Sequence, residues 1–325
     1  MKYSFYFLIA SVLFSCNNEP RGSLLNDGNS DPTINASVFE DVSALIEDLK
    51  TPPQLFDIND QNAPSTITGE KGTVINFNAN SFTDSDGNPV TSGIIIELQE
   101  YLSLSDMMKN NIQTTSGGQL LVTGGSFNLS ATDNSGNSLS VAPWSIGAEL
   151  PILTDISGFE SDMRLFVGQS TTVNGMEQID WNTDTNNTQE FWLDGGIMNF
   201  YGIDLGLSNC DVLYDMASEN PTQFSVYVAD NTNPQNYVIW MFINDFPSVI
   251  YISSPTDDGL GVKTYDGSIP VGLNATLLAI GVDDDNYLKF GTLDISVQGD
   301  DVFTITTDYG TSEVLNELID QLGAQ

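Results

Sequence analysis

The chain has 325 residues with eight Lys and Arg, 44 Asp and Glu and no histidine, which gives a net charge of −36. A surface of this charge repels nucleic acid and anionic lipid, so neither is expected as a partner. The lack of histidine removes the commonest general base and zinc ligand, and with them Ser-His-Asp and Cys-His catalysis. We therefore expect a protein that is not an enzyme and has no cofactor and no metal site.

Residues 1–15 have the features of a signal peptide. Lys2 supplies one positive charge, and the apolar run over 5–14 that follows is too short for a membrane-spanning helix. Leu13-Phe14-Ser15-Cys16 resembles the lipobox of bacterial lipoproteins, in which the cysteine carries diacylglycerol and becomes the first mature residue. We predict lipid attachment at Cys16. The alternative is an ordinary cleaved signal that leaves Cys16 as a free thiol.

Residues 16–36 are rich in Asn, Asp, Gly, Ser and Pro, a composition that buries too little apolar surface to fold. They are predicted to be a flexible tether. The other cysteine is Cys210, so a lipid on Cys16 leaves no intramolecular disulfide. We expect Cys210 to be a buried, small apolar residue.

Residues 37–143 are expected to form a first domain, a helix followed by a β-sandwich. Ser37-Val38-Phe39-Glu40 has the form of a capping box, and apolar residues at helical spacing follow as far as Leu49, before Pro52 and Pro53. Short alternating or β-branched runs then predict antiparallel strands at 73–77, 93–98, 119–122 and 126–131. A short helix-like excursion over 103–109 and a turn over 114–118 are expected between them.

Three polar segments along the chain are predicted to be hairpin turns. These are 84–88, 133–137 and the acidic 283–286, each placed where a hairpin reverses. The first resembles a calcium loop, but Pro89 and Ile95 stand where an EF-hand loop needs glycine and a bidentate glutamate. Gly124-Gly125 predicts a bulge or a close backbone approach.

Residues 144–255 are expected to form a middle β domain, and they hold all four tryptophans, at 144, 181, 192 and 240. The predicted strands are 162–167, 178–181, 189–193, 196–203, 223–229 and 237–243. The last is apolar on both faces and should be a central buried strand. Core packing is the favoured role for the tryptophans, and a sugar-stacking platform is the alternative.

Residues 256–325 are expected to form a C-terminal β unit with a terminal helix. Strands are predicted at 275–282 and 287–290, followed by a helix capped by Thr311 or Ser312. Its apolar face is expected to hold Val314, Leu315, Leu318, Ile319 and Leu322. The fold class is therefore mainly β, with two or three antiparallel sandwich-like domains, a short N-terminal helix and a C-terminal helix.

Several motifs occur together along the mature chain. They are Gly72-Thr73-Val74-Ile75, Ala79-Asn80-Ser81-Phe82, Asp86-Gly87-Asn88-Pro89-Val90, Ile94-Ile95-Ile96-Glu97-Leu98 with Glu100, Asp106-Met107-Met108, Thr114-Thr115-Ser116-Gly117-Gly118, Leu120-Leu121, Gly124-Gly125, Leu205-Gly206-Leu207-Ser208-Asn209-Cys210-Asp211 and Ile269-Pro270-Val271-Gly272. With them the chain resembles a family of envelope lipoproteins of Bacteroidota. Leu207 and Ser208 replace that family's Trp and Ile, and Phe77 replaces a common proline. The resemblance implies an envelope lipoprotein with an N-terminal β-sandwich module and brings no catalytic residue.

Three functions follow as hypotheses. The first is a lipid-anchored outer-membrane lipoprotein, at the cell surface rather than on the periplasmic side, that acts as a non-enzymatic structural or interaction module. It would serve as an accessory subunit of a surface complex for secretion, motility or nutrient uptake. The second is a carbohydrate- or calcium-dependent surface binder. The third is a carboxylate-pair hydrolase, because 308–311 is faintly similar to an aspartic protease motif.

Overall fold

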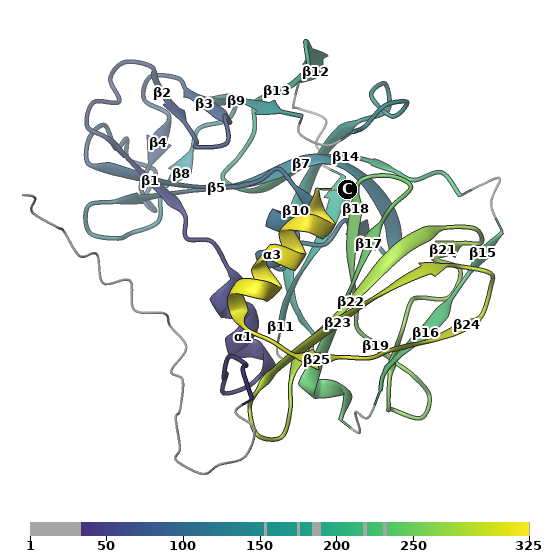
Figure 1. Ribbon diagram of the computed structural model, residues 1–325. Helices are drawn as coiled ribbons and strands as arrows, with labels where there is room; N and C mark the ends of the chain where they lie inside the picture. Colours follow the sequence, from purple (N-terminus) through teal and green to yellow (C-terminus); the bar gives the residue numbers. More distant parts are fainter. Residues whose placement is uncertain are drawn as a thin grey trace, which may run out of the picture.

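The computed structural model describes residues 34–152, 155–173, 176–183, 190–216, 220–229 and 233–324, and it confirms a mainly β chain built from several antiparallel sheets (Figure 1). Four larger sheets and three α-helices make up most of the described part. The predicted short helix near the N-terminus and the helix at the C-terminus are both present.

The first two sheets are formed by residues before 214. The second sheet is drawn at the top of Figure 1, and the first extends from there down to the centre of the picture. In order across the first sheet, the strands are β1 (Gln54–Ile58), β5 (Ile94–Tyr101), β7 (Gln119–Asp133), β14 (Gly206–Leu213), β10 (Arg164–Val173) and β11 (Met176–Thr183), with the short β6 (Thr115–Ser116) paired to β7. Those of the second sheet are β12 (Glu190–Asp194), β13 (Ile197–Tyr201), β9 (Ile146–Pro151), β3 (Val74–Phe77) and β2 (Ser65–Thr68).

The other two large sheets are formed by residues after 220. The third holds β19 (Ser254–Pro255), β20 (Val262–Lys263), β16 (Phe224–Val228) and β24 (Asp301–Ile305), and the fourth holds β18 (Ser248–Ile252), β17 (Tyr237–Ile243), β22 (Asn274–Val282), β23 (Leu288–Ser296) and β25 (Asp308–Tyr309). The pair β16 and β24 is parallel. There are also two small two-stranded sheets. One pairs β4 (Phe82–Thr83) with β8 (Ser140–Val141), and the other pairs β15 (Pro221–Thr222) with β21 (Ile269–Pro270). A short 3-10 helix, η1 (Pro234–Asn236), precedes β17.

Alternation along the strands directs apolar side chains into two cores. In β5, for example, Ile94, Ile96 and Leu98 are fully buried and belong to the larger core, to which residues of all four large sheets contribute. Burial of apolar area at roughly 25 cal/mol per Å² is the main favourable term in such a sandwich. β17 lies between β18 and β22 and is buried on both faces, so the predicted central strand over 237–243 is confirmed.

A helical layer fills the space between the first and fourth sheets. It consists of α1 (Val42–Leu49), α2 (Leu104–Lys109) and α3 (Ser312–Gly323); α2 packs against α3, which is drawn in yellow at the centre of Figure 1. Leu45, Met107 and Ile319 are fully buried in one cluster with Trp181 and Trp240. The helices therefore link the half of the molecule that holds the first sheet to the half that holds the fourth sheet, through this second core.

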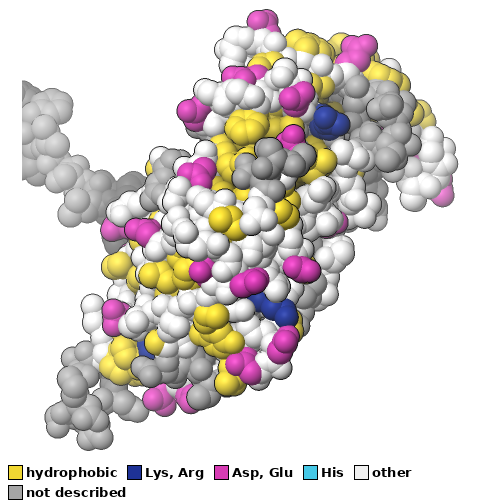
Figure 2. Space-filling model, turned by 90° about the vertical axis from the view of Figure 1, so that its right-hand side faces the viewer, with side chains coloured by type: hydrophobic (Ala, Val, Ile, Leu, Met, Phe, Trp, Pro, Cys, Tyr) yellow, Lys and Arg dark blue, Asp and Glu magenta, His cyan; other side chains and the backbone are white. Residues whose placement is uncertain are grey.

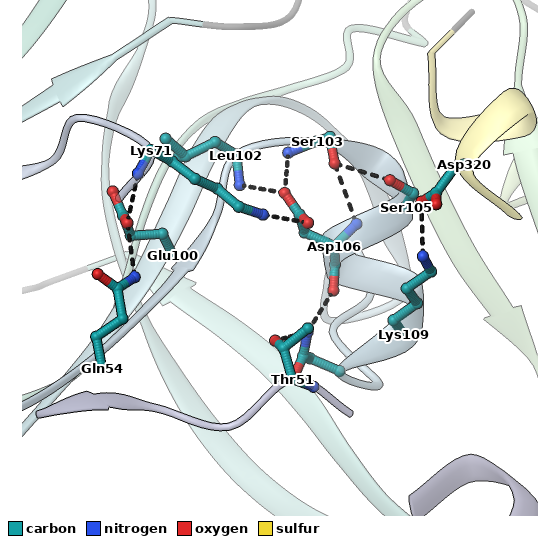
Figure 3. Close-up of polar contacts among 11 residues, drawn as sticks. Thr51, Gln54, Lys71, Glu100, Leu102, Ser103, Ser105, Asp106, Lys109 and Asp320 are labelled. Carbon is teal, nitrogen blue, oxygen red and sulfur yellow. Dashed lines mark hydrogen bonds and ion pairs between the residues drawn. The ribbon is translucent and has the colours of Figure 1, made fainter. Parts of the chain in front are cut away.

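A network of carboxylates fixes the start of α2 and the turn before β3 (Figure 3). Glu100, 5 % exposed, accepts hydrogen bonds from the backbone N–H of Lys71 (2.9 Å) and Thr73 (2.9 Å) and from Nε2 of Gln54 (2.8 Å). Asp106 closes a capping box with Ser103, and its carboxylate also pairs with Nζ of Lys71. Three segments distant in the sequence are thus held together at one point.

The helix over 37–49 is shorter than predicted. α1 begins at Val42, with Asp41 as its N-cap, and the Asp41 carboxylate accepts from N–H of Ala44 at 2.8 Å. Ser37 instead bonds to the C-terminal part of the chain. Its N–H donates to O of Gly310 (3.0 Å), its carbonyl accepts from Leu288 (2.8 Å), and its hydroxyl accepts from N–H of Ser312 (2.9 Å). This long-range pairing outweighs the local capping signal.

Two further expectations need correction. The strands predicted at 119–122 and 126–131 are one strand, β7, interrupted by the predicted bulge at Gly124-Gly125, where the register with β14 shifts. A Cβ at Gly124 would lie 2.9 Å from Sδ of Met198, which is the close approach that the pair of glycines indicated. In α3, Thr311 is the N-cap as expected, but Val314 is 52 % exposed and does not share the buried face.

The domain boundaries expected at 143/144 and 255/256 remain predictions, and strand pairs cross both positions. β3 pairs with β9, β7 pairs with β14, and β17 pairs with β22. Within the described ranges, no helix combines the length and the apolar character needed to cross a membrane.

Candidate functional site

A groove lies between the β6–β7 hairpin and β11 on one side and residues 264–268 on the other. Its outer part encloses about 570 Å³, and a narrow inner part of about 30 Å³ reaches β18. Both parts are lined by Gln113, Thr115, Gly118, Gln178, Tyr265 and Ser268. We call this feature the polar groove. Its outer volume is within the roughly 300–1,000 Å³ that small-ligand sites enclose.

Gln178 faces the groove because of its place in β11. The neighbouring Ile179 and Trp181 point to the opposite side, into the core that contains the helices. Alternation along the strand therefore turns Gln178 and Asp180 toward the groove. Gln178 is only 7 % exposed, and its Nε2 has no hydrogen-bond partner in the described part of the chain. An unpaired buried donor of this kind costs about 1–3 kcal/mol.

Gln113 connects the two halves of the molecule at the inner end of the groove. Its backbone oxygen accepts from Nε1 of Trp181 at 2.6 Å. Its side-chain amide donates to the carbonyl of Ile179 and accepts from N–H of Tyr251, both at 3.4 Å. These two amide contacts are longer than the ordinary 2.7–3.2 Å, so the amide is only weakly engaged.

Tyr265 lies on the other wall and is 60 % exposed. Its ring rests against Gly118, where a Cβ would lie 3.4 Å from Cδ2 of Tyr265. Gly118 has a φ of +82°, so both the turn and the close approach of the ring favour glycine. The carbonyl of Tyr265 accepts from N–H (3.2 Å) and Oγ (2.8 Å) of Ser268, which closes the turn that holds the ring.

The charge in the groove is negative. Asp180 and Asp266 line the outer part, and Asp180 also accepts from N–H of Gly117 at 3.0 Å, which fixes the hairpin tip. The inner part is lined by Lys263, whose Nζ is paired with Asp257 at 2.8 Å. Burial raises the pKa of Tyr251, another inner residue, to about 12, so its hydroxyl stays protonated at neutral pH. The groove therefore offers amides, carboxylates and an open aromatic ring, which suit binding through hydrogen bonds and stacking.

A second hollow, of about 590 Å³, lies beside the start of α1. Asp41, Ser43, Asn236 and Tyr237 contribute to its lining. Of these two hollows, the polar groove is the one whose lining includes a buried side-chain donor without a partner, Nε2 of Gln178, so it is the stronger candidate for a ligand site.

The four tryptophans divide into two pairs. Trp181 and Trp240 are 0 % and 1 % exposed, so the predicted core role is confirmed for them. Trp144 and Trp192 are 40 % and 47 % exposed, just before β9 and in β12 of the second sheet. The Trp144 ring packs on Tyr201 with ring centroids 5.9 Å apart. The favoured core role therefore does not extend to Trp144 and Trp192, and a sugar-stacking platform, the alternative, cannot include the buried Trp181 and Trp240.

The acidic turns use their carboxylates locally. Asp84 accepts from N–H of Asp86 (2.9 Å) and Asn88 (2.8 Å), and the Asn88 side chain lowers the pKa of Asp84. Asp133 has the same arrangement, with Asn137 lowering its pKa. The hairpin-turn interpretation is confirmed for both. Over the described ranges, no group of three or more Cys, Asp or Glu side chains is arranged to hold a metal ion.

Residues 308–311, which are faintly similar to an aspartic protease motif, make contacts that hold the fold together. Asp308 and Tyr309 form the edge strand β25, and Thr311 caps α3. The hydroxyl of Tyr309 donates to Oδ2 of Asp283 at 2.7 Å, and this bond raises the pKa of Tyr309 to about 12. The resemblance to an aspartic protease motif thus falls on a helix cap and a strand edge.

Cys16, the predicted lipid-attachment residue, lies outside the described residues. Cys210 is fully buried, as expected, and burial followed by the charge of Asp211 raises its pKa. Asp211 is also fully buried beside the β7 bulge, and burial raises the pKa of its carboxyl. Nδ2 of Asn209 donates to Asp211 at 2.5 Å. The Asn-Cys-Asp element is therefore part of the core.

The residues of the polar groove were not singled out from the sequence. Gln178 lies within a predicted strand and Gly118 within a predicted turn, so their local structure was expected. Nothing in the sequence indicated that Tyr265 would lie against Gly118, because that contact depends on how the two halves pack. The available signal was limited to the alternation of Gln178 and Asp180 with the apolar Ile179 and Trp181 along the strand.

No family model, curated protein or solved structure matches the chain. The similarity to Bacteroidota lipoproteins therefore stays a prediction from short motifs.

Proposed function

We propose that this protein is an outer-membrane lipoprotein, anchored by a lipid on Cys16, whose β body is a non-enzymatic interaction module. The observation that carries the interaction role is the polar groove, with the unpaired Nε2 of Gln178 in its wall. A signal-like segment over 1–15 and the composition of 16–36 support the anchor and the tether.

The join between tether and body supports this arrangement. Ser37 is held by backbone and side-chain hydrogen bonds to residues close to the C-terminus, so the body is fixed from its first described residues onward. Strands β11 and β18 border the groove and belong to different sheets joined by the helical layer. A site built on such elements is held in one shape, as a recognition site requires.

The negative charge of the β body favours a binding partner other than the membrane surface. Acidic side chains are spread over the face in Figure 2, and basic ones are few. Such a surface is repelled by anionic lipid, which leaves the body free to meet a partner at the end of its tether. We propose an accessory role in a surface complex for secretion, motility or nutrient uptake, with the body at the cell surface.

The anchor can be tested by metabolic labelling with an alkyne fatty acid in the native host. We expect the wild-type chain to carry the label, Cys16→Ser to lose it, and the matched control Cys210→Ser to keep it. A wild-type chain without label, or a labelled Cys16→Ser chain, would rule out lipid attachment at Cys16.

The interaction role can be tested by purifying the lipidated protein from native membranes in mild detergent. We expect outer-membrane proteins to co-purify in fixed proportion, and protease added to intact cells to remove the body. Recovery of the chain alone at full yield would contradict a stable complex. Protection from the protease would place the body on the periplasmic side.

A second candidate function is carbohydrate binding at the cell surface. It is favoured by the exposure of the Tyr265 ring in the polar groove. The calcium-dependent form is less favoured, since Asp84 and Asp133 bind backbone N–H groups of their own turns. A ligand at a hundred times its Kd would stabilise the fold by about 2.7 kcal/mol, so melting curves with added glycan or calcium test both forms.

A further inference from the structure

We propose that the polar groove binds a neutral oligosaccharide, with the amides of Gln178 and Gln113 bonded to sugar hydroxyls and the ring of Tyr265 stacked on a sugar face. The inference rests on the proposed role as a binding module and adds the site and the ligand class. Three observations lead to it: an unpaired donor, an open ring and the charge of the lining.

The unpaired donor is Nε2 of Gln178. The residue is 7 % exposed, so bulk water does not satisfy this amide as it would on an open surface. A buried donor without a partner costs free energy, and a ligand that supplies an acceptor removes that cost. Gln113 lies beside it and has two amide contacts of 3.4 Å, which a ligand hydroxyl can replace with shorter ones.

The open ring is that of Tyr265. One side of it rests on Gly118, and the side chain is nevertheless 60 % exposed, so another part of the ring stays accessible. An aromatic ring fixed over a glycine presents a flat apolar surface next to hydrogen-bonding groups. Sugar rings match this combination, because they have apolar C–H faces and polar edges.

The charge of the lining selects against anions. Asp180 and Asp266 line the outer part, and Lys263 of the inner part is already paired with Asp257. An anionic polymer would meet uncompensated carboxylates, whereas hydroxyl groups can donate to Asp180. A neutral glycan is thus favoured over a uronic-acid polymer.

The test uses the full lipidated chain, purified in a polyoxyethylene detergent because alkyl glycosides would compete for the groove. A glycan array with neutral and uronic-acid oligosaccharides is followed by calorimetric titration with the tightest neutral glycan on the array. We expect saturable binding of at least one neutral glycan and none of oligogalacturonate. No binding across the neutral array, or preferred binding of the uronic acids, would overturn the proposal.

Variants then locate the site. Tyr265→Ala should weaken binding about tenfold or more, whereas Tyr265→Phe, which keeps the ring, should stay within about twofold. Gln178→Met should weaken binding by a similar factor while the melting temperature stays equal or rises, because the unpaired amide is removed. Equal affinity of wild type and Tyr265→Ala would exclude the groove, even if Gln178→Met failed to fold.

Trp192→Ala is the matched control, since it removes an exposed aromatic side chain from the second sheet. It should leave the affinity unchanged. Loss of binding in Trp192→Ala with full binding in Tyr265→Ala would move the site to the second sheet and overturn the inference. Calorimetry does not depend on the anchor, so failure of Cys16 labelling and failure of glycan binding are separate results.

Discussion

The hydroxyl groups of Thr114 and Ser248 lie 2.7 Å apart, and both residues are fully buried where the first and fourth sheets meet. Thr114 also exchanges hydrogen bonds with Val249: its N–H donates to the Val249 carbonyl, and its hydroxyl accepts from the Val249 N–H, both at 2.8 Å. The N–H of Thr123 donates to O of Pro247 at 2.9 Å nearby. The two halves are therefore joined by polar contacts that water does not reach.

Loss of this contact should destabilise the whole molecule. Thr114→Val leaves the Ser248 hydroxyl and the Val249 N–H without their partner, so we expect the free energy of unfolding to fall by about 1–3 kcal/mol. Urea denaturation followed by fluorescence measures it. Thr68→Val, an exposed threonine of β2, is the control and should stay within about 0.5 kcal/mol. A single transition is expected for both, and a second transition in wild type would show that the halves unfold separately.

Glu100 should be among the most sensitive acidic residues. Replacement by Ala removes the acceptor of two backbone N–H groups and of Gln54, so we expect a loss of about 3 kcal/mol or more. Glu97→Ala is the comparison, because Glu97 is half-buried and accepts from the hydroxyl of Ser130 at 3.1 Å. Its effect should be about 1 kcal/mol or less. Similar losses for the two variants, by urea denaturation, would argue against the role given to Glu100.

Asp211→Asn should change how stability depends on pH. Burial raises the pKa of Asp211, so its contribution to stability is fully present below the unfolded pKa, near 4, and is lost as pH rises through the folded pKa. Asn does not ionise, so the Asp211→Asn variant does not lose this stability as the pH rises. We expect Asp211→Asn to be at least as stable as wild type at pH 7, with the difference vanishing toward pH 4, measured as urea midpoints over this range. Lower stability of the variant at pH 7 would mean that the ionised carboxylate stabilises the fold.

Cys210 should be unreactive in the folded protein. It is fully buried, and its thiol pKa is raised, so both access and thiolate population are low. With Cys16 lipidated, a thiol-specific chromogenic reagent reports on Cys210 alone. We expect its rate in the native state to be roughly a hundredfold or more below that in guanidinium chloride. Rapid native labelling would instead indicate local opening around β14.

Local patterns were sufficient where burial decides the structure. The segment over 237–243 is apolar on both faces, and β17 has those bounds because a strand between two others needs both faces apolar. Gly124-Gly125 indicated a bulge because residues without Cβ allow close approach, and the register shift lies there. In both cases the residue types follow directly from how the segment must pack, so the local sequence is enough to predict the structure.

Contacts between distant segments could not be derived in the same way. Ser37 had the pattern of a capping box, yet it bonds to Gly310 and Leu288, and the helix begins later. The groove depends on Gln178 and Tyr265 meeting across two halves of the fold. Neither residue has a local sequence pattern that predicts this proximity. A polar residue in a strand, such as Gln178, has the same pattern whether its side chain faces solvent or a cavity.

The attachment of Ser37 also sets the path of mechanical force. A pull on a tether ahead of residue 37 would load the hydrogen bonds to Gly310, Leu288 and Ser312 first, at the β23–β25 edge of the fourth sheet. The polar groove borders β18, which is the opposite edge of that sheet. Drag on the body would thus be carried by strands remote from the groove, and the groove would keep its shape under tension.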